Sequence, residues 1–179
     1  MITKYEELFQ NKKNFDRLKN AIKKVDGRIV VLVHPFSSPD VEYTKQYKRN
    51  IRQIVQKSKF PVFILIGEGE PKKILEGRIA EGQQIVVVET HSGNPAPTYP
   101  KHLKQQNTLK FFSEMLANAG VQRVLLGGEL GKFYRGAKKL YGICVPVIAT
   151  AIKDHTKINV TVMPEMLWME KLPMFKHGK

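Results

Sequence analysis

Five short runs of β-branched and aliphatic residues recur along the chain, and they constrain its fold more than any other feature. The runs span residues 28–33, 61–67, 84–90, 121–127 and 158–163. The run 28–33 is almost continuously apolar, which is typical of a strand that is covered on both faces, and the run 61–67 has the same character. We therefore predict five strands, separated by segments that are long enough to hold a helix between each pair.

The segments between these runs carry helical signals. Apolar side chains recur at intervals of three and four within residues 38–58 and again within residues 100–119. Ser38 followed by Pro39 is typical of a helix start, because proline in the first turn lacks only an N–H group that would have no partner there. Residues 143–153 fit either a buried helix or a strand, and their length and small residues favour the helix.

The two ends of the chain add further elements. Thr3 and Glu6 have the spacing of a capping box, so residues 1–26 are predicted to form an N-terminal helix. Residues 164–179 form an apolar tail without clear periodicity. Large apolar groups in this number either close the core or contact a second subunit, and we favour the subunit contact. The chain is therefore expected to form a homo-oligomer through its tail.

Strands that alternate with helices indicate βαβ units, whose right-handed crossovers build a parallel sheet with helices on both faces. We predict one α/β domain over residues 1–179, arranged as a three-layer α/β/α sandwich. Its sheet is doubly wound, mainly parallel and five-stranded, with strand order 3-2-1-4-5. This architecture is Rossmann-like or flavodoxin-like, with the extra N-terminal helix packed against it.

The composition indicates where the protein is located and which kinds of partner it binds. No apolar run is long enough to span a bilayer, and the first residues are too polar for a signal peptide, so we expect no membrane partner and a cytoplasmic location. A single cysteine, Cys144, excludes a disulfide framework within the chain. The net charge of +14 favours anionic partners.

Ionisable residues gather at one edge of the predicted sheet. Parallel strands bring all their carboxyl ends to the same edge, and ligands bind there near the point where the strand order reverses. His34 follows the first strand, His91 the third and Glu129 the fourth. We predict His34 or His91 as a general base, with Glu129 as the carboxylate partner of His34. The alternatives are a histidine that only ends a strand and a solvated surface histidine.

A second set of polar residues at this edge is predicted to hold the substrate. The set contains Ser37, Ser38, Glu68, Glu89, Lys132 and Arg135. The two serines precede a helix amino terminus, which favours anions, and the two cations follow the fourth strand. The expected ligand is therefore an anionic small molecule, and the expected reaction is hydrolysis or group transfer. We predict no metal and identify no cofactor.

A basic helix face supports a different function. The cations Lys45, Lys48, Arg49 and Arg52 form a narrow stripe opposite the apolar face of the helix in residues 38–58. A stripe of this kind fits a nucleic-acid-binding protein, although an ordinary solvated helix face has the same pattern. A structural or regulatory subunit that assembles through its tail is a third hypothesis.

The segment ICVPVIATAIKDHTKINVTVM, residues 143–163, resembles the Cys-Val helix and following strand of the isochorismatase-like cysteine hydrolases. The resemblance implies that Cys144 is the nucleophile, served by an aspartate at the end of strand one and a lysine after a later strand. Strand one of this chain ends in Val33 and His34, without an aspartate. From the residues alone, Cys144 also fits a small buried apolar side chain.

Overall fold

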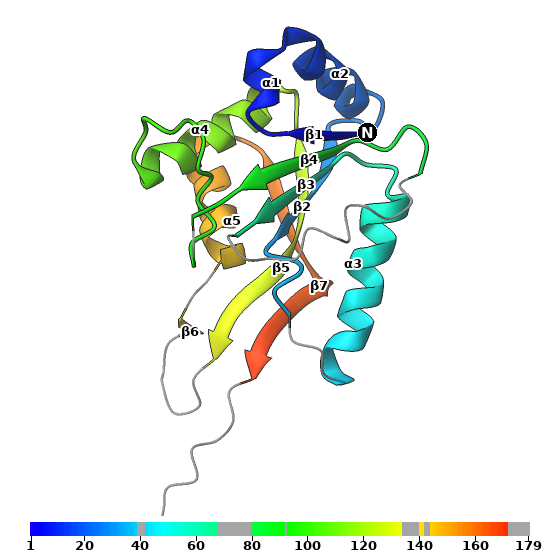
Figure 1. Cartoon of the computed structure of the whole chain (residues 1–179), viewed down its shortest axis with the longest axis vertical. Helices are drawn as coiled ribbons and strands as arrows, with labels where there is room; N and C mark the ends of the chain where they lie inside the picture. Colours follow the sequence, from blue (N-terminus) through cyan, green and yellow to red (C-terminus); the bar gives the residue numbers. More distant parts are fainter. Residues whose placement is uncertain (39–41, 68–79, 92, 134–139, 142–143, 172–179) are drawn as a thin grey trace, which may run out of the picture.

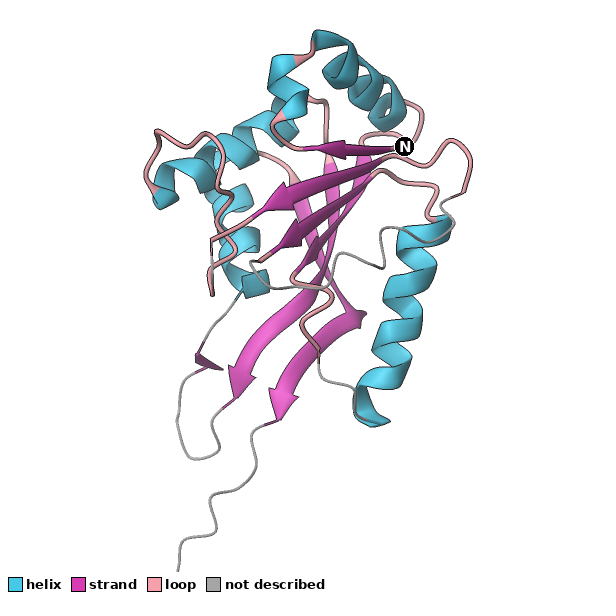
Figure 2. Cartoon of the chain, in the orientation of Figure 1, coloured by secondary structure: helices cyan, strands magenta, loops and turns pink. Residues whose placement is uncertain are grey.

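The computed structural model describes residues 1–38, 42–67, 80–91, 93–133, 140–141 and 144–171, and all its strands belong to one sheet (Figures 1 and 2). The strands are β1 (Ile2–Lys4), β2 (Arg28–Val33), β3 (Val62–Ile66), β4 (Ile85–Glu89), β5 (Arg123–Phe133), β6 (Leu140–Tyr141) and β7 (Asn159–Lys171). The helices are α1 (Glu7–Gln10), α2 (Lys12–Lys23), α3 (Lys45–Lys57), α4 (Gln105–Asn118) and α5 (Cys144–His155), and a 3₁₀ turn, η1 (Glu42–Thr44), precedes α3.

The predicted α/β class is confirmed. The strands lie in the order β1-β4-β3-β2-β5-β7, and every neighbouring pair in this series is parallel. The five predicted strands therefore take the predicted order, 3-2-1-4-5. The sheet has two additions that the sequence did not predict. β1 extends it beyond β4, and the short β6 pairs antiparallel with the end of β5.

Side chains of the central strands alternate between two hydrophobic layers. On β2, Ile29 and Val31 face a core that is completed by α1, α2, α4 and α5, whereas Val30 and Leu32 face α3. Figure 1 shows α3 on the opposite side of the sheet from α4 and α5. Each fully buried aliphatic side chain contributes about 1.5–3 kcal/mol, so the apolar runs stabilise both layers at once. This double coverage explains why the runs that form β2 and β3 have no polar alternation.

The N-terminal helix predicted over residues 1–26 is wrong in its first part. Thr3 lies in β1, where it pairs with Val86, and it is not a helix cap. Asn11 instead caps α2 by accepting a hydrogen bond from the N–H of Lys13 at 3.0 Å. Pairing with the open edge of β4 satisfies the backbone groups of β1, and this tertiary contact outweighs the local capping signal of Thr3 and Glu6.

One helix begins later than predicted, the start of another lies outside the described residues, and one uncertain element is settled. The helix expected to start at Ser38 and Pro39 is described from Glu42, where η1 leads into α3, and residues 39–41 lie outside the described residues. The hydroxyl of Tyr47 donates to the carbonyl of Pro35 at 3.0 Å, which ties the turn after β2 to the first turn of α3. α4 begins at Gln105 and not at Pro100. Residues 144–153 of the segment 143–153 are helical, as favoured above, and residue 143 lies outside the described residues.

The strands β5 and β7 are longer than predicted. The fourth and fifth strands were predicted over residues 121–127 and 158–163, but β5 continues to Phe133 and β7 continues through part of the predicted tail to Lys171. Irregular register between them hides the period of two on which strand prediction depends. On β7, Met166 and Trp168 are buried against the α3 layer. This part of the tail therefore closes the core of its own chain, and the predicted subunit contact stays a prediction.

None of the described helices combines the length and the apolar character needed to cross a lipid bilayer.

Candidate active site

His34 is the first residue after β2, and it has an unusual backbone conformation. Its φ angle is 46°, a left-handed value that few residues other than glycine adopt. Its N–H still donates to the carbonyl of Leu65 at 2.8 Å, so the β2–β3 ladder continues to the point where the chain turns. The residue is 5% exposed. A buried histidine with strained backbone is a feature that clusters at functional sites.

Both ring nitrogens of His34 have a polar neighbour. Nε2 lies 3.0 Å from Oγ1 of Thr90, a buried residue that directly follows β4. Nδ1 lies 3.7 Å from Oε2 of Glu129 on β5. The Thr90 hydroxyl fixes the plane of the His34 ring, and the Glu129 carboxylate is close enough to stabilise that ring when it is protonated. The imidazole is therefore held between groups from two other strands.

Gly128 explains how Glu129 reaches this position. Gly128 has a φ angle of 116°, and a Cβ atom placed there would lie only 1.9 Å from the carbonyl oxygen of Val33. The backbone of β5 therefore lies directly against the end of β2, which no side chain at position 128 would permit. The next residue, Glu129, lies beside His34 as a result, and its side chain is 14% exposed.

Ser37 links the carboxylate to the turn after β2. Its hydroxyl oxygen lies 2.7 Å from the carbonyl oxygen of His34 and 3.2 Å from Oε2 of Glu129, and it can donate to either acceptor. Ser37 itself is exposed. A hydroxyl at this place orients the Glu129 carboxylate without neutralising it.

Cys144 completes the group. It is the first residue of α5, it is 5% exposed, and it is the one cysteine of the chain. Its sulfur, one ring nitrogen of His34 and a carboxylate oxygen of Glu129 all lie within 4.8 Å of one another. The helix dipole places partial positive charge at the amino end of α5, which favours an anionic group there.

These three side chains support two kinds of chemistry. A thiol beside an imidazole that is itself held by a third group is the arrangement of a cysteine nucleophile with its base. Imidazole, thiolate and carboxylate are also ligands that Zn²⁺ accepts, so the same atoms could hold a metal ion. We refer to Cys144, His34 and Glu129 together as the thiol site.

The other predicted catalytic and substrate-binding residues lie in several different places in the structure. His91 is exposed at the start of the loop after β4, with Thr90 between it and the strand. Glu89 lines a small cavity beside β1 together with Tyr5 and Tyr99. Ser38 is buried, and its hydroxyl has no hydrogen-bond partner among the described residues. Residues 39–41 separate Ser38 from η1 and lie outside the described residues, so the predicted place of the two serines at a helix amino terminus stays a prediction.

Three further predicted substrate residues cannot be placed at the site. Glu68 and Arg135 lie outside the described residues. Lys132 lies within β5 and not in a loop, with Tyr141 and Glu170 as its partners in the sheet, and its side chain is not described. Their predicted roles stay predictions.

The basic stripe of α3 points away from the sheet, as predicted. Lys45, Arg49 and Arg52 are exposed and Lys48 is partly buried, whereas Tyr47 on the opposite face is buried. Lys45 also forms an ion pair with Glu42 at 2.5 Å. The proposed use of this stripe for nucleic-acid binding is untested.

Two members of the site received little weight in the sequence. Thr90 stands at the tip of a strand, beside the more conspicuous His91. Cys144 opens the helix that follows β5, and in a parallel sheet the helix after a strand begins at the carboxyl edge of that strand. This rule places Cys144 near His34 from topology alone, and it was the signal that could have found the residue.

Comparison with known proteins adds little to this geometry. No protein-family model matches the sequence, and no curated protein matches it significantly. Among solved structures, the MAR1 ribonuclease from Caenorhabditis elegans is similar, with a TM-score of 0.46 and 15% sequence identity. The match covers 79% of this chain and 64% of that chain, so this chain spans less than two thirds of the ribonuclease.

Proposed function

We propose that the chain is an enzyme that uses Cys144 as a nucleophile in hydrolysis or group transfer on a small carbonyl substrate. The observation that carries this proposal is the grouping of Cys144, His34 and Glu129 within 4.8 Å, from segments that are far apart in the sequence. Burial also supports the proposal, because a dry site strengthens the interactions among charged groups.

The roles follow from the contacts of each group. The imidazole of His34 takes the proton of the Cys144 thiol, and the thiolate attacks the carbonyl carbon to form a sulfur–carbon bond. The imidazolium returns the proton to the leaving group as its bond to carbon breaks. Water or a second acceptor then attacks the thioester, with His34 again as base. Glu129 stabilises the imidazolium, and Thr90 holds the ring in place.

An anionic substrate is part of the proposal. The chain carries a net charge of +14, which raises the local concentration of anions around it. The amino end of α5 adds partial positive charge beside the sulfur. A carboxylate- or phosphate-bearing substrate therefore suits the site better than a cation.

The single cysteine makes a direct test available, because any thiol label on this chain reports Cys144 alone. The rate of iodoacetamide alkylation of the folded protein is followed by mass spectrometry across pH. His34→Asn is the main variant, since asparagine tolerates left-handed backbone better than most residues. Alkylation follows the thiolate fraction, and an ordinary cysteine thiol is only a few per cent thiolate at pH 7, so we expect the variant to react about 10-fold or more slowly near neutral pH.

A matched control separates this effect from a general change in α5. His155→Ala removes an exposed histidine from the last turn of the same helix, and alkylation is expected to keep the wild-type rate. If wild-type Cys144 reacts only as fast as the whole protein unfolds, the thiol is an inert core group and the proposal is wrong. Screening with activated esters and amides then identifies the substrate class by thioester accumulation.

A metal-dependent hydrolase is a second candidate, favoured by the mixed nitrogen, sulfur and oxygen donors of the thiol site. Three protein ligands leave one position open for water in a catalytic zinc site. The Thr90 contact fits this role too, because a ligating histidine usually has its other nitrogen in a hydrogen bond. Stoichiometric Co²⁺ binding with a thiolate charge-transfer band, lost in Cys144→Ser, would favour the metal, whereas rapid alkylation without bound metal favours the nucleophile.

A further inference from the structure

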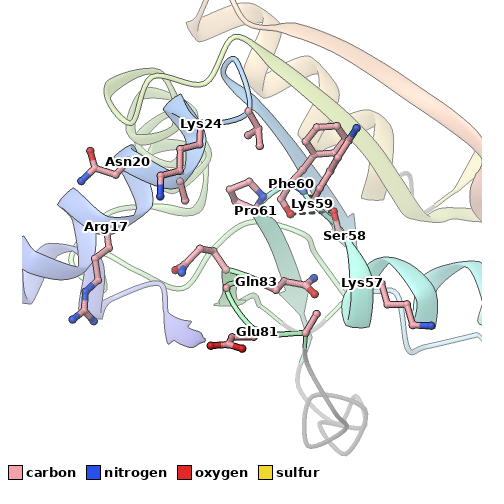
Figure 3. Close-up of a pocket in the computed structure, with 15 residues that line it drawn as sticks. Arg17, Asn20, Lys24, Lys57, Ser58, Lys59, Phe60, Pro61, Glu81 and Gln83 are labelled. Carbon is pink, nitrogen blue, oxygen red and sulfur yellow. Dashed lines mark hydrogen bonds between the residues drawn. The ribbon is translucent and has the colours of Figure 1, made fainter.

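A basic cavity lies at the amino ends of the strands, and the thiol site lies at their carboxyl ends. Its volume is about 710 Å³, within the range of small-molecule binding sites. Figure 3 shows that its walls come from three segments: α2, the end of α3 with the turn that follows it, and the turn before β4. Its position beside the starts of β3 and β4 separates it from the site where the proposed chemistry occurs.

The walls of this cavity, which we call the amino-edge cavity, are strongly cationic. Four exposed cations line it: Arg17, Lys24, Lys57 and Lys59. A single acidic residue, Glu81, stands against them. Within the part of the chain that the structure describes, none of the four cations forms an ion pair. Their charges are therefore available to a polyanion.

An aromatic ring accompanies these charges. Phe60 lines the cavity and is only partly buried. The Lys59 ammonium lies 5.3 Å from the centre of its ring, and the Arg28 guanidinium lies 5.4 Å from it. The side chain of Ser58 bonds the backbone of Phe60 at 3.0 Å in both directions, which fixes the turn that presents the ring. The cavity thus combines an aromatic ring, held on a fixed turn, with several cations.

We propose that the amino-edge cavity binds single-stranded nucleic acid. Each unit of such a strand carries a phosphate for the cations and a flat base for Phe60, and this pairing of charge and stacking is typical of single-strand recognition. An acidic peptide would satisfy the cations but offers no regular planar group to the ring. The net charge of +14 adds long-range attraction for a polyanion.

Fluorescence anisotropy with a labelled single-stranded oligonucleotide tests the site. Lys24→Glu/Lys59→Glu is the cavity variant. Arg49→Glu/Arg52→Glu is the matched control, because it makes the same charge change at exposed positions of α3 outside the cavity. The cavity variant is expected to bind at least about 10-fold more weakly, and the control less than about 3-fold. With four phosphate contacts, wild-type affinity falls about 50-fold between about 50 and 200 mM salt.

A second variant tests the ring independently of charge. Phe60→Leu keeps apolar volume but removes the stacking face, and it is expected to weaken binding about 5- to 100-fold. Phe15→Leu is its control, since Phe15 is a partly buried aromatic with Lys19 5.9 Å from its ring centre and lies outside the cavity.

Equal losses from the cavity and α3 charge variants would overturn the proposal, because binding would then follow diffuse charge. Inorganic polyphosphate that competes as well as the oligonucleotide, with no effect of Phe60→Leu, would overturn it as well. The proposal shares no residue with the thiol site. Alkylation of Cys144 is therefore expected to proceed at the wild-type rate in Lys24→Glu/Lys59→Glu, which keeps the two proposals separately testable.

Discussion

The two edges of the sheet present their polar groups in opposite ways. At the carboxyl edge, His34 and Cys144 are each 5% exposed, and backbone contacts between β2 and β5 set the surroundings of His34. At the amino edge, the cations of the cavity are exposed on α2, on α3 and on the residues that directly follow each helix. Buried groups have one geometry, whereas exposed lysines have many rotamers.

The chain therefore has two kinds of site, one formed by buried side chains and one formed by exposed cations. A buried group that loses a partner leaves that partner unsatisfied, so a single substitution has a large effect. Exposed cations act through their summed field, which salt screens and which neighbouring charges partly replace. Substitutions at the carboxyl edge are therefore expected to change stability and reactivity strongly. Substitutions at the amino edge are expected to change binding with little effect on stability.

The largest expected effect is that of Gly128→Ala. A methyl group at this position would meet the Val33 carbonyl at 1.9 Å in a backbone conformation that strains any L-residue. We expect unfolding free energy to fall by about 3 kcal/mol or more, measured by urea denaturation. Gly82→Ala, at the amino edge, has φ 82° but nothing within 4 Å, so about 1 kcal/mol is expected there. Equal losses in the two variants would contradict the proposed difference between the edges.

Thr90→Val is expected to have the next largest effect. It removes the hydroxyl that lies 3.0 Å from Nε2 of His34 and leaves a buried ring nitrogen without its partner. The unfolding free energy should fall by about 1–3 kcal/mol, and alkylation of Cys144 should slow in parallel. Thr98→Val is the control, because the Thr98 hydroxyl bonds the Glu89 carbonyl in a more exposed setting. A Thr90 variant with unchanged thiol reactivity would remove Thr90 from the site.

A smaller effect is expected from pH at Tyr5, which follows β1 and packs edge-on against Phe9, Tyr99 and Phe112. Burial, and secondarily the charge of Tyr99, raises the pKa of the Tyr5 phenol far above its ordinary value. Because the folded-state pKa is raised, the stabilising contribution is fully present below the unfolded-state pKa. That contribution is lost as pH rises above the unfolded-state value.

The measurement is the unfolding free energy of wild type and Tyr5→Phe across alkaline pH. From about pH 10 to about pH 11 the wild type should lose about 1 kcal/mol more than Tyr5→Phe. At neutral pH the two should be nearly equal, because the Tyr5 hydroxyl has no hydrogen-bond partner among the described residues. Parallel curves for the two proteins would show that Tyr5 titrates normally.

The smallest effect on stability is expected at the amino-edge cavity. Lys24→Glu/Lys59→Glu should change the unfolding free energy by less than about 0.5 kcal/mol, because both side chains are exposed and neither belongs to an ion pair in the described part of the chain. Urea denaturation measures this change. A large destabilisation would mean that the cations support the fold and do not serve a ligand.

The centre of the sheet could be predicted because strands such as β2 and β3 are covered on both faces. Continuous apolar runs mark such strands, and the handedness of the crossovers restricts their order. The proximity of His34 and Glu129 followed from this order, since β2 and β5 are neighbours. The strand β1 could not be predicted in the same way. It has three residues, it pairs only with β4, and its sequence overlaps a plausible helix cap.

The remainder of the site depends on features that sequence patterns do not record. The bulges between β5 and β7 break the alternation that would have marked their outer halves as strands. The approach of Gly128 to Val33 depends on a left-handed backbone that glycine permits but does not require. The amino-edge cavity joins cations from α2 and α3 that lie about forty residues apart in the chain. Only the packing of these helices against the sheet brings them together.

The direct contact between Gly128 and Val33 has a consequence for how this protein tolerates change. The separation of the imidazole and the carboxylate is set by main-chain atoms in adjacent strands, so it is insulated from repacking of the hydrophobic layers. The sulfur has no such protection, because α5 packs on one of those layers through Val145, Ile148 and Ile152. Successive substitutions that change the size of the core side chains under α5 would therefore move the Cys144 thiol relative to His34 and Glu129. The reactivity of the thiol would then change before the free energy of unfolding did.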